Sequence, residues 1–242
     1  MKENVKLSCR IGFGALAGFL MACVLLGPVT AATAADRAEA QAIVDKSKGA
    51  LTDLMGDENF SWLHGYLKKA KGVLIFPQVL KGGFILGGSG GTGVLMTRSS
   101  ETGTWSDPAF YTLGSVTFGL QIGGEAAEVV MVAMTQKAID SLLASTLKLG
   151  GDASVAIGPI GGGAKGSVSI PEVTADFVSF TKAKGLYAGL NLEGSVLEVR
   201  DSLNAAYYGK EAKPADILVK KSVSNSGANS LRAALQKESA KK

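Results

Sequence analysis

The chain has 242 residues, a formal net charge of +4 and a hydrophobic content of 46%. This length is enough for one domain with its own core. The charge is too small for the strongly basic surface of a typical nucleic-acid-binding protein, so we expect no nucleic-acid partner. One histidine and two cysteines are too few to suggest a zinc site, and we expect neither a metal nor a cofactor.

Residues 1–34 have the layout of a secretory signal peptide. Lys2, Lys6 and Arg10 precede an apolar run over residues 11–26, and Ala32-Thr33-Ala34 supplies a small-residue cleavage pattern. The run is short for a membrane span. We therefore expect an exported protein, periplasmic or associated with the cell envelope.

Two alternatives remain open for this segment. It could stay uncleaved as an anchor, or "LMAC", ending at Cys23, could act as the lipidation motif of a bacterial lipoprotein. Cys9 and Cys23 both lie inside the segment, so the exported chain would have no disulfide and no reactive thiol.

Two amphipathic helices are expected after the signal segment, between residues 36 and 71. Ile43, Ser47, Leu51 and Leu54 share one helical face, and the residues "MGDEN" then interrupt the pattern. A second apolar stripe follows over residues 62–70, with lysines and Gly72 as stop signals.

A glycine-rich region with the two-residue period of strands runs from Gly72 to Gly194. Apolar residues alternate over residues 116–122 and 186–196, whereas residues 128–134 form a continuous apolar run typical of a strand buried on both faces. Helices are expected over "TQKAIDSLLAST" and near "RDSLNAAYY".

We expect about eight or nine strands, mostly antiparallel because few βαβ spacings occur. The glycines favour bulges and bends within them. The predicted fold class is α+β: a glycine-rich, strongly curved or barrel-like sheet with flanking N- and C-terminal helices. A single domain should span residues 35–221, and residues 222–242 should form a polar, loose C-terminal tail with a short amphipathic piece around Leu231, Ala234 and Leu235.

The glycine run of residues 87–93 matches two catalytic or cofactor patterns, G-x-G-x-x-G and G-x-S-x-G. The first must open a helix, but "VLMTR" after Gly93 predicts a strand. The second needs a histidine later in the chain, and the one histidine, His64, comes earlier. We interpret the run as a strand, a tight connection and a strand.

Other motifs are also weak. "GPIGGGAKGS" (158–167) has its lysine one position out of register with a phosphate loop and is interpreted as a hairpin. His64 is interpreted as a packed or surface helix residue, and Asp57-Glu58 as a solvated turn. We expect a non-enzyme. A catalytic cleft would have to be assembled from carboxylates distant in sequence, such as Asp107, Glu125, Asp152 and Asp176.

Six residues around the predicted helix–strand junction form the candidate lipid-binding site. They are Lys68, Lys69, Lys71, Lys81, Trp62 and Tyr66. Such lysines could meet lipid phosphates while the aromatic rings sit at headgroup depth. The alternative is a helix end whose lysines only favour its dipole and keep it soluble.

Four stretches resemble the SYLF-domain family and occur in the family's order. They are "AKGVLIFPQVLKGGFILGGSGGTGVL", "WSDPAFYTLGSVTFGLQIGGEAAEVVMV", "KLGGDASVAIGPIG" and "KGLYAGLNLEGSVL". The resemblance implies lipid binding, since eukaryotic members bind phosphoinositides and some bind actin. Carried over to this chain, the resemblance implies that the four lysines of the candidate site bind lipid together with the helix face of residues 43–55. It provides no short site motif to transfer residue by residue.

An exported member would more plausibly meet bacterial anionic phospholipid or glycolipid headgroups at a membrane surface than actin or phosphoinositides. The competing hypothesis is a structural or protein-interaction module with an unidentified envelope partner. The two differ in whether lipid or protein accompanies the chain during purification.

Overall fold

The structure is a computed structural model that describes residues 33–83, 86–118, 123–161, 174–183, 186–187 and 192–240. The apolar part of the predicted signal peptide, the lipidation motif, Cys9 and Cys23 lie outside the described residues. The same holds for parts of the predicted alternating strands, at 119–122 and 188–191, and for most of the predicted hairpin at 158–167.

Nine described strands form one strongly curved sheet in the order β5-β9-β3-β2-β1-β4-β7-β6, with β8 paired to β7. All ladders are antiparallel except β6–β7, which is parallel. The strands are β1 (Gly72–Gly83), β2 (Leu86–Thr97), β3 (Ala109–Phe118), β4 (Gly123–Ala133), β5 (Thr146–Lys148), β6 (Val155–Ile157), β7 (Phe177–Ala183), β8 (Leu186–Tyr187) and β9 (Val196–Val199).

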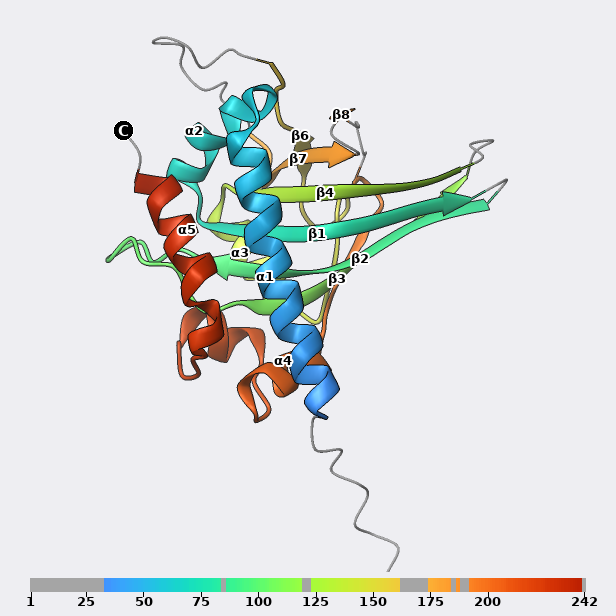
Figure 1. Ribbon diagram of the computed structural model, residues 1–242. Coiled ribbons are helices and arrows are strands. Elements are labelled where there is room, and N and C mark those ends of the chain that lie inside the picture. The colour runs from blue at the N-terminus through green and yellow to red at the C-terminus, as the bar shows by residue number, and fades with distance from the viewer. Residues whose placement is uncertain are drawn as a thin grey trace, which may run out of the picture. The chain divides into compact units, whose positions relative to one another are not determined.

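The helices come mainly from the two ends of the described chain. They are α1 (Ala34–Gly56), the short η1 (Glu58–Phe60), α2 (Ser61–Lys69), α3 (Gln136–Leu142), α4 (Asp201–Tyr208), η2 (Ala215–Val219), η3 (Ser226–Ala228) and α5 (Asn229–Ala240). In Figure 1, α1 crosses one face of the sheet with α5 beside it. This arrangement confirms the predicted α+β class with helices flanking a curved sheet.

The predicted pair of N-terminal helices is present. Thr33 caps α1 in a capping box with Asp36, which satisfies free N–H groups of the first turn. The break comes at Asp57, whose side chain accepts a hydrogen bond from the Asn59 backbone and begins η1. The two amphipathic stretches therefore become two helices with different directions.

Both faces of the central strands are covered. On the α1 side, Leu51 and Leu54 pack with Ile75 and Val130. On the opposite side, Leu74, Phe76, Tyr111 and Met131 pack with residues of α3 and η2 in a second buried cluster. Residues 129–133 of β4 are 0% exposed, which confirms the prediction of a strand buried on both faces.

β1 contains a bulge at Pro77 and Gln78, next to α1. Pro77 and Gln78 have no partner in either neighbouring ladder, because the register shifts between Phe76 and Val79 against β4 and between Ile75 and Leu80 against β2. A proline cannot donate to a ladder, and bulges bend the strand that carries them. β1 therefore bends where it leaves the cover of α1.

The glycine run at 87–93 lies within one strand, β2, and not at a strand–turn–strand junction as predicted. A side chain at Gly91 or Gly93 would collide with the backbone carbonyl of Gln78 or Ile75 in β1. These two glycines therefore serve the close approach of β1 at its bulge. The G-x-G-x-x-G and G-x-S-x-G patterns both need a helix directly after the glycine turn. Here the run continues as strand β2, so neither pattern has its required structure.

The predicted continuous strand over residues 186–196 is interrupted. Glu193 and Gly194 form a turn, and Gly194 has φ +81°, a conformation that favours glycine. β9 begins only at Val196. Apolar alternation across a turn was mistaken for one strand, because glycine fits both patterns.

The C-terminal segment is packed rather than loose over residues 223–240, and the amphipathic piece predicted around Leu231, Ala234 and Leu235 is present as part of α5. Leu231 and Leu235 of α5 are 0% exposed and belong to the core on the α1 side. Arg232 adds an ion pair to Asp107, and Trp105 donates a ring hydrogen bond to Ser239. Burying two leucines contributes about 3–6 kcal/mol in transfer free energy, which holds a helix that is polar on its other faces.

Candidate functional site

Three of the predicted lysines form a cluster with an arginine that the sequence analysis did not include. Lys68 and Lys69 end α2, Lys71 follows before β1, and all three are exposed. The Arg98 guanidinium donates to the Lys68 carbonyl at 2.8 Å, and the Arg98 backbone N–H donates to the Lys71 carbonyl at 2.8 Å. We call Lys68, Lys69, Lys71 and Arg98 the α2 basic patch.

The β1–β2 register explains why Arg98 belongs to this patch. Gly72 pairs with Thr97, so the residue after β2 lies beside the residue before β1. This pairing is a long-range feature that sequence spacing does not reveal. It could have been found by pairing the two predicted strands as a hairpin.

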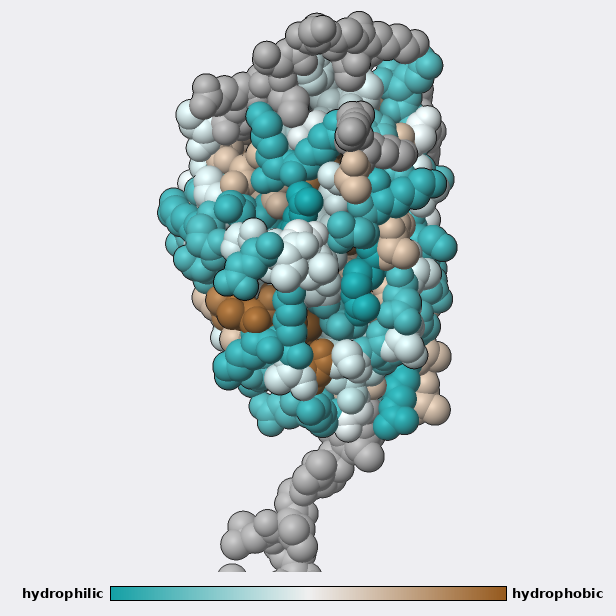
Figure 2. All heavy atoms as spheres, turned by 90° about the vertical axis from the view of Figure 1, so that its left-hand side faces the viewer, coloured by the Kyte–Doolittle hydropathy of each residue, from teal (hydrophilic) through white to brown (hydrophobic). Residues whose placement is uncertain are grey.

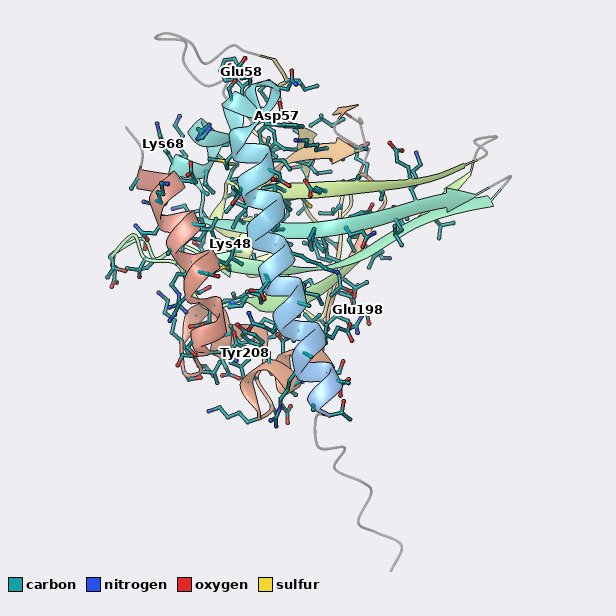
Figure 3. All side chains as sticks on the ribbon, viewed as in Figure 1. Lys48, Asp57, Glu58, Lys68, Glu198 and Tyr208 are labelled. Atoms are coloured by element: carbon teal, nitrogen blue, oxygen red, sulfur yellow. The ribbon has the colours of Figure 1, made fainter. Side chains whose placement is uncertain are left out.

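The patch lies on a hydrophilic side of the molecule. Figure 3 shows Lys68 on the outer side of α2, away from the sheet. Figure 2, which views the side toward which α2 and α5 lie, shows mostly hydrophilic atoms with small apolar areas. The lysines also occupy the last turn of α2, where cations are favoured by the helix dipole. The arrangement fits contact with charged groups at a surface.

The two aromatic residues of the predicted site are not free at the surface: Tyr66 is buried and Trp62 is half-buried. Tyr66 is 1% exposed, and its ring lies 5.7 Å from that of Phe180 in the core. Burial raises the pKa of the Tyr66 hydroxyl. Trp62 is half-buried and packs against the same core. The Tyr66 ring cannot reach a headgroup while α2 is folded.

The predicted apolar helix face is also occupied. Val44, Leu51, Leu54 and Met55 of α1 are buried against the sheet and the other helices. The amphipathic pattern of this helix therefore reports packing within the domain. It leaves no broad apolar face on α1 for a membrane.

Lys81 lies away from the other three lysines. It stands near the far end of β1, where its ladder partners are Ser89 and Glu125. Ten residues of strand separate it from Lys71, about 30 Å at the usual rise. Proximity in sequence across an extended strand does not bring side chains together, so Lys81 is not part of the α2 basic patch.

A groove with a volume of about 580 Å³ lies between α1 and the bend of β1 and β4. Its charged lining residues are Lys46 and Asp53 of α1, Glu128 of β4 and Lys182 of β7. Its floor and walls include small or apolar residues, among them Gly49, Pro77, Ala126 and Ala127. We call this feature the α1 groove. No sequence pattern predicted this groove, because its lining comes from α1, β1, β4 and β7, which are far apart in the chain.

Of the charged side chains that line the α1 groove, Lys182 has an ion-pair partner, whereas Asp53 and Glu128 have none among the described residues. Lys182 forms an ion pair with Asp57 at 3.0 Å and lies opposite Glu128 in the β4–β7 ladder. In the described part of the chain, neither Asp53 nor Glu128 makes a hydrogen bond or an ion pair within 4 Å through its side chain. Burial, with a further contribution from the nearby Asp53, raises the pKa of Glu128.

The four carboxylates considered for a catalytic cleft do not share one site. Asp107 is paired with Arg232 at 2.6 Å, and Asp152 accepts the Lys148 backbone N–H. Asp176 accepts hydrogen bonds from Thr135 and Ser154, while Glu125 lies on β4 opposite Lys81. The described residues contain no group of three or more histidine, cysteine or acidic side chains placed to hold a metal.

His64 has a structural position, as the sequence analysis expected. Its Nδ1 lies 3.5 Å from a Glu238 carboxylate oxygen of α5, and its Nε2 lies 3.1 Å from the Met55 carbonyl. These contacts join α2 to α1 and α5. Among the described residues, no helix combines the length and hydropathy needed to cross a membrane.

The described residues combine a curved sheet under terminal helices with a basic patch at one corner. The chain belongs to the family described as "Ysc84: Las17-binding protein actin regulator", whose model matches residues 114–238. This match confirms the resemblance to SYLF-domain proteins. The family is one of binding and regulatory domains.

Curated relatives match a longer part of the chain than the family model does. The chain is 34% identical over 153 residues to SH3 domain-containing YSC84-like protein 1 of Homo sapiens, covering 63% of this chain and 44% of the relative. It is 38% identical over 146 residues to LAS seventeen-binding protein 3 of Saccharomyces cerevisiae, covering 59% and 31%. The chain therefore matches less than half the length of these relatives.

Proposed function

We propose that this chain is a non-enzymatic lipid-binding module of the bacterial envelope, attached to anionic phospholipid or glycolipid headgroups by the α2 basic patch. The observation that carries this proposal is the grouping of Lys68, Lys69, Lys71 and Arg98 at one exposed corner. Each cation near an anionic membrane surface contributes about 1 kcal/mol of attraction. The patch therefore supplies a few kcal/mol without inserting an apolar face.

The rigid setting of the patch supports this role. α2 is held by Leu63 and Leu67, which are 0% exposed, and Arg98 joins the end of α2 to the end of β2. The cations are thus presented by packed elements, and binding would order few additional backbone groups.

The test compares two triple charge reversals in sedimentation with phosphatidylglycerol vesicles. Lys68→Glu, Lys69→Glu and Lys71→Glu together should weaken binding at least about 100-fold at low salt, since three attractive charges are lost. Lys48→Glu, Lys148→Glu and Lys210→Glu form the control, because these lysines are exposed, lie on α1, on β5 and after α4, and give the same change in net charge.

Equal losses in both triple variants would assign binding to net charge and contradict a localised patch. Undiminished binding of the patch variant would contradict the proposal directly. Thermal unfolding of both variants should show native cooperativity, because all six lysines are exposed.

A second candidate is a protein-interaction module. It is favoured by the family description, which names Las17 binding and actin regulation for the family. This role predicts a protein partner that co-purifies with the chain in detergent and a purified sample without bound lipid. Retention of lipid with no such protein would favour the first proposal.

A further inference from the structure

The α1 groove has the size and lining of a ligand site. Its volume of about 580 Å³ is in the range typical of small-molecule pockets, which are mainly apolar with a few polar groups. Lys46, Gly49 and Asp53 line it from α1 at positions i, i+3 and i+7, which fall on one helical face. Across the groove stand Ala126, Ala127 and Glu128 of β4.

Gly49 costs helix stability with no packing reason inside the protein. It lies in the interior of α1, and a Cβ added there would meet no atom within 4 Å. Glycine in a helix interior is about 1 kcal/mol less favourable than alanine. The open space above Gly49 is part of the α1 groove, so the missing side chain enlarges the groove.

The charged side chains that line the groove favour a ligand with a positively charged head group. Lys182 is paired with Asp57 at 3.0 Å and also attracts Glu128. Among the described residues neither Asp53 nor Glu128 has an ion pair within 4 Å, so both carboxylates are available to a ligand at this end of the groove. Burial of Glu128 and its repulsion by the nearby Asp53 both disfavour the ionised carboxylate, and the attraction of Lys182 offsets them only in part. A primary ammonium offers three donors and one positive charge, which can serve both carboxylates at once.

Lys46 supplies the complementary charge. It lies seven residues before Asp53, about 10 Å along the helix axis, and its side chain is exposed and long enough to turn toward the groove. A phosphate attached to the amine by a short linker would meet this lysine. The lining therefore fits a zwitterion with an ammonium and a phosphate.

An apolar path leads away from the carboxylates on the same face of the sheet. Ala126 lies two residues before Glu128, on the same face of β4, and pairs with Leu80, a β1 side chain that is 56% exposed. Leu80 in turn pairs with Gly90 of β2. In Figure 1 these strands extend beyond the cover of α1. A hydrocarbon chain leaving the groove would find a smooth, side-chain-poor surface there.

We infer that the α1 groove binds an amphiphile whose head is a primary ammonium beside a phosphate, as in a phosphoethanolamine lipid. Asp53 and Glu128 bind the ammonium, Lys46 contacts the phosphate, and Ala126 and Leu80 contact the start of the acyl part. This inference deepens the proposed lipid-binding function by naming a second site and its headgroup. It is tested with soluble short-chain lipids, so its outcome is independent of vesicle attachment.

Titration calorimetry would compare dihexanoyl-phosphatidylethanolamine with the choline and glycerol analogues. The ethanolamine lipid should bind at least about tenfold more tightly than either, because only its head carries ammonium N–H donors. Free phosphoethanolamine should bind at least about tenfold more weakly, because it lacks the apolar part. Equal binding of the choline or glycerol lipid, or of free phosphoethanolamine, would overturn the inference.

Two variants locate the site. Asp53→Asn with Glu128→Gln, and separately Gly49→Met, should each lower affinity for the ethanolamine lipid at least about tenfold, by loss of charge and by filling the groove. Glu39→Gln with Glu198→Gln is the matched control, since both carboxylates are exposed and outside the groove lining. Undiminished binding by both groove variants, with native thermal unfolding, would overturn the assignment.

The two proposals fail in different ways. Loss of vesicle binding in the patch variant together with equal short-chain affinity in the groove variants would contradict the groove alone. Ethanolamine-lipid binding that depends on Asp53 and Glu128, together with vesicle binding indifferent to the α2 basic patch, would contradict the patch alone.

Discussion

Asp176 shows how a single carboxylate fastens the loops behind the sheet. It accepts hydrogen bonds from the Thr135 hydroxyl at 2.7 Å and from the Ser154 backbone at 3.0 Å, and Lys137 lies 3.3 Å away. Burial alone would raise its pKa, but these hydrogen bonds outweigh burial and hold the pKa at about 2. The ionised form is therefore stabilised by folding.

This shift predicts a specific dependence of stability on pH. Because the pKa is lower in the folded chain than in the unfolded chain, the contribution is complete above about pH 4 and is lost as pH falls toward 2. Asp176→Asn should cost about 2 kcal/mol at pH 7, and the difference from the natural chain should shrink below pH 4. Urea unfolding at pH 7, 4 and 2.5 measures it.

The control for this prediction is Asp140→Asn, an exposed carboxylate that accepts one hydrogen bond from Gln136. It should change stability by less than about 0.5 kcal/mol at each pH. A penalty for Asp176→Asn that stays constant from pH 7 to pH 2.5 would contradict the linkage and indicate only a packing defect.

At the residue scale, the sequence identified lysines that are exposed, but it did not show which of the six predicted site residues lie together. Lys68, Lys69 and Lys71 are exposed, as a surface cluster requires, but Tyr66 is in the core and Lys81 lies along an extended strand. Tyrosine fits both a membrane interface and a core, so composition alone could not separate the two. Arg98 and the α1 groove depend on strand pairing across long sequence distances.

At the scale of elements, α5 is the part most at odds with its sequence. Its polar composition suggested a loose segment, yet Leu231 and Leu235 are fully buried and Glu238 reaches His64 of α2. Two apolar positions four residues apart are enough to dock a helix when the facing surface is already formed. A local pattern could not show that α1 and α2 leave such a surface.

Leu235→Ala tests this docking. The variant should lose about 2–4 kcal/mol, the usual cost of truncating a buried leucine, and protease sensitivity should increase first in the C-terminal segment. Gln236→Ala, at an exposed position of the same helix, should change stability by less than about 0.5 kcal/mol. If both variants unfold at the same urea concentration, the helix does not contribute to the cooperative unit.

The sequence predicted that strands are present and that the sheet is curved, but it did not predict where each strand bends or which strands approach closely. The continuous apolar run became the central strand β4, and glycine density correctly indicated a bent sheet. The bulge at Pro77 and the close approach at Gly91 and Gly93 came from pairing between strands. Glycine marks such places in a sequence without showing which neighbour requires it.

At the scale of the whole molecule, two proposed lipid contacts differ in their exposure to solvent. The α2 basic patch presents three exposed lysines beside a half-buried Arg98, whereas Glu128 of the α1 groove is half-buried between α1 and the sheet. Salt at 0.1 M screens exposed charges beyond about 10 Å, but partly buried pairs much less. Ionic strength should therefore separate the two contacts.

Raising NaCl from 50 to 500 mM should weaken binding to phosphatidylglycerol vesicles at least about tenfold, because it depends on several exposed cations. Affinity for dihexanoyl-phosphatidylethanolamine should change less than about threefold, because Glu128 is partly desolvated and the contacts of the apolar part are not weakened by salt. Sedimentation and calorimetry on the same preparation give the two curves. Parallel loss of both affinities would show that the lipids share one exposed electrostatic site, and would contradict the assignment of separate contacts to the patch and the groove.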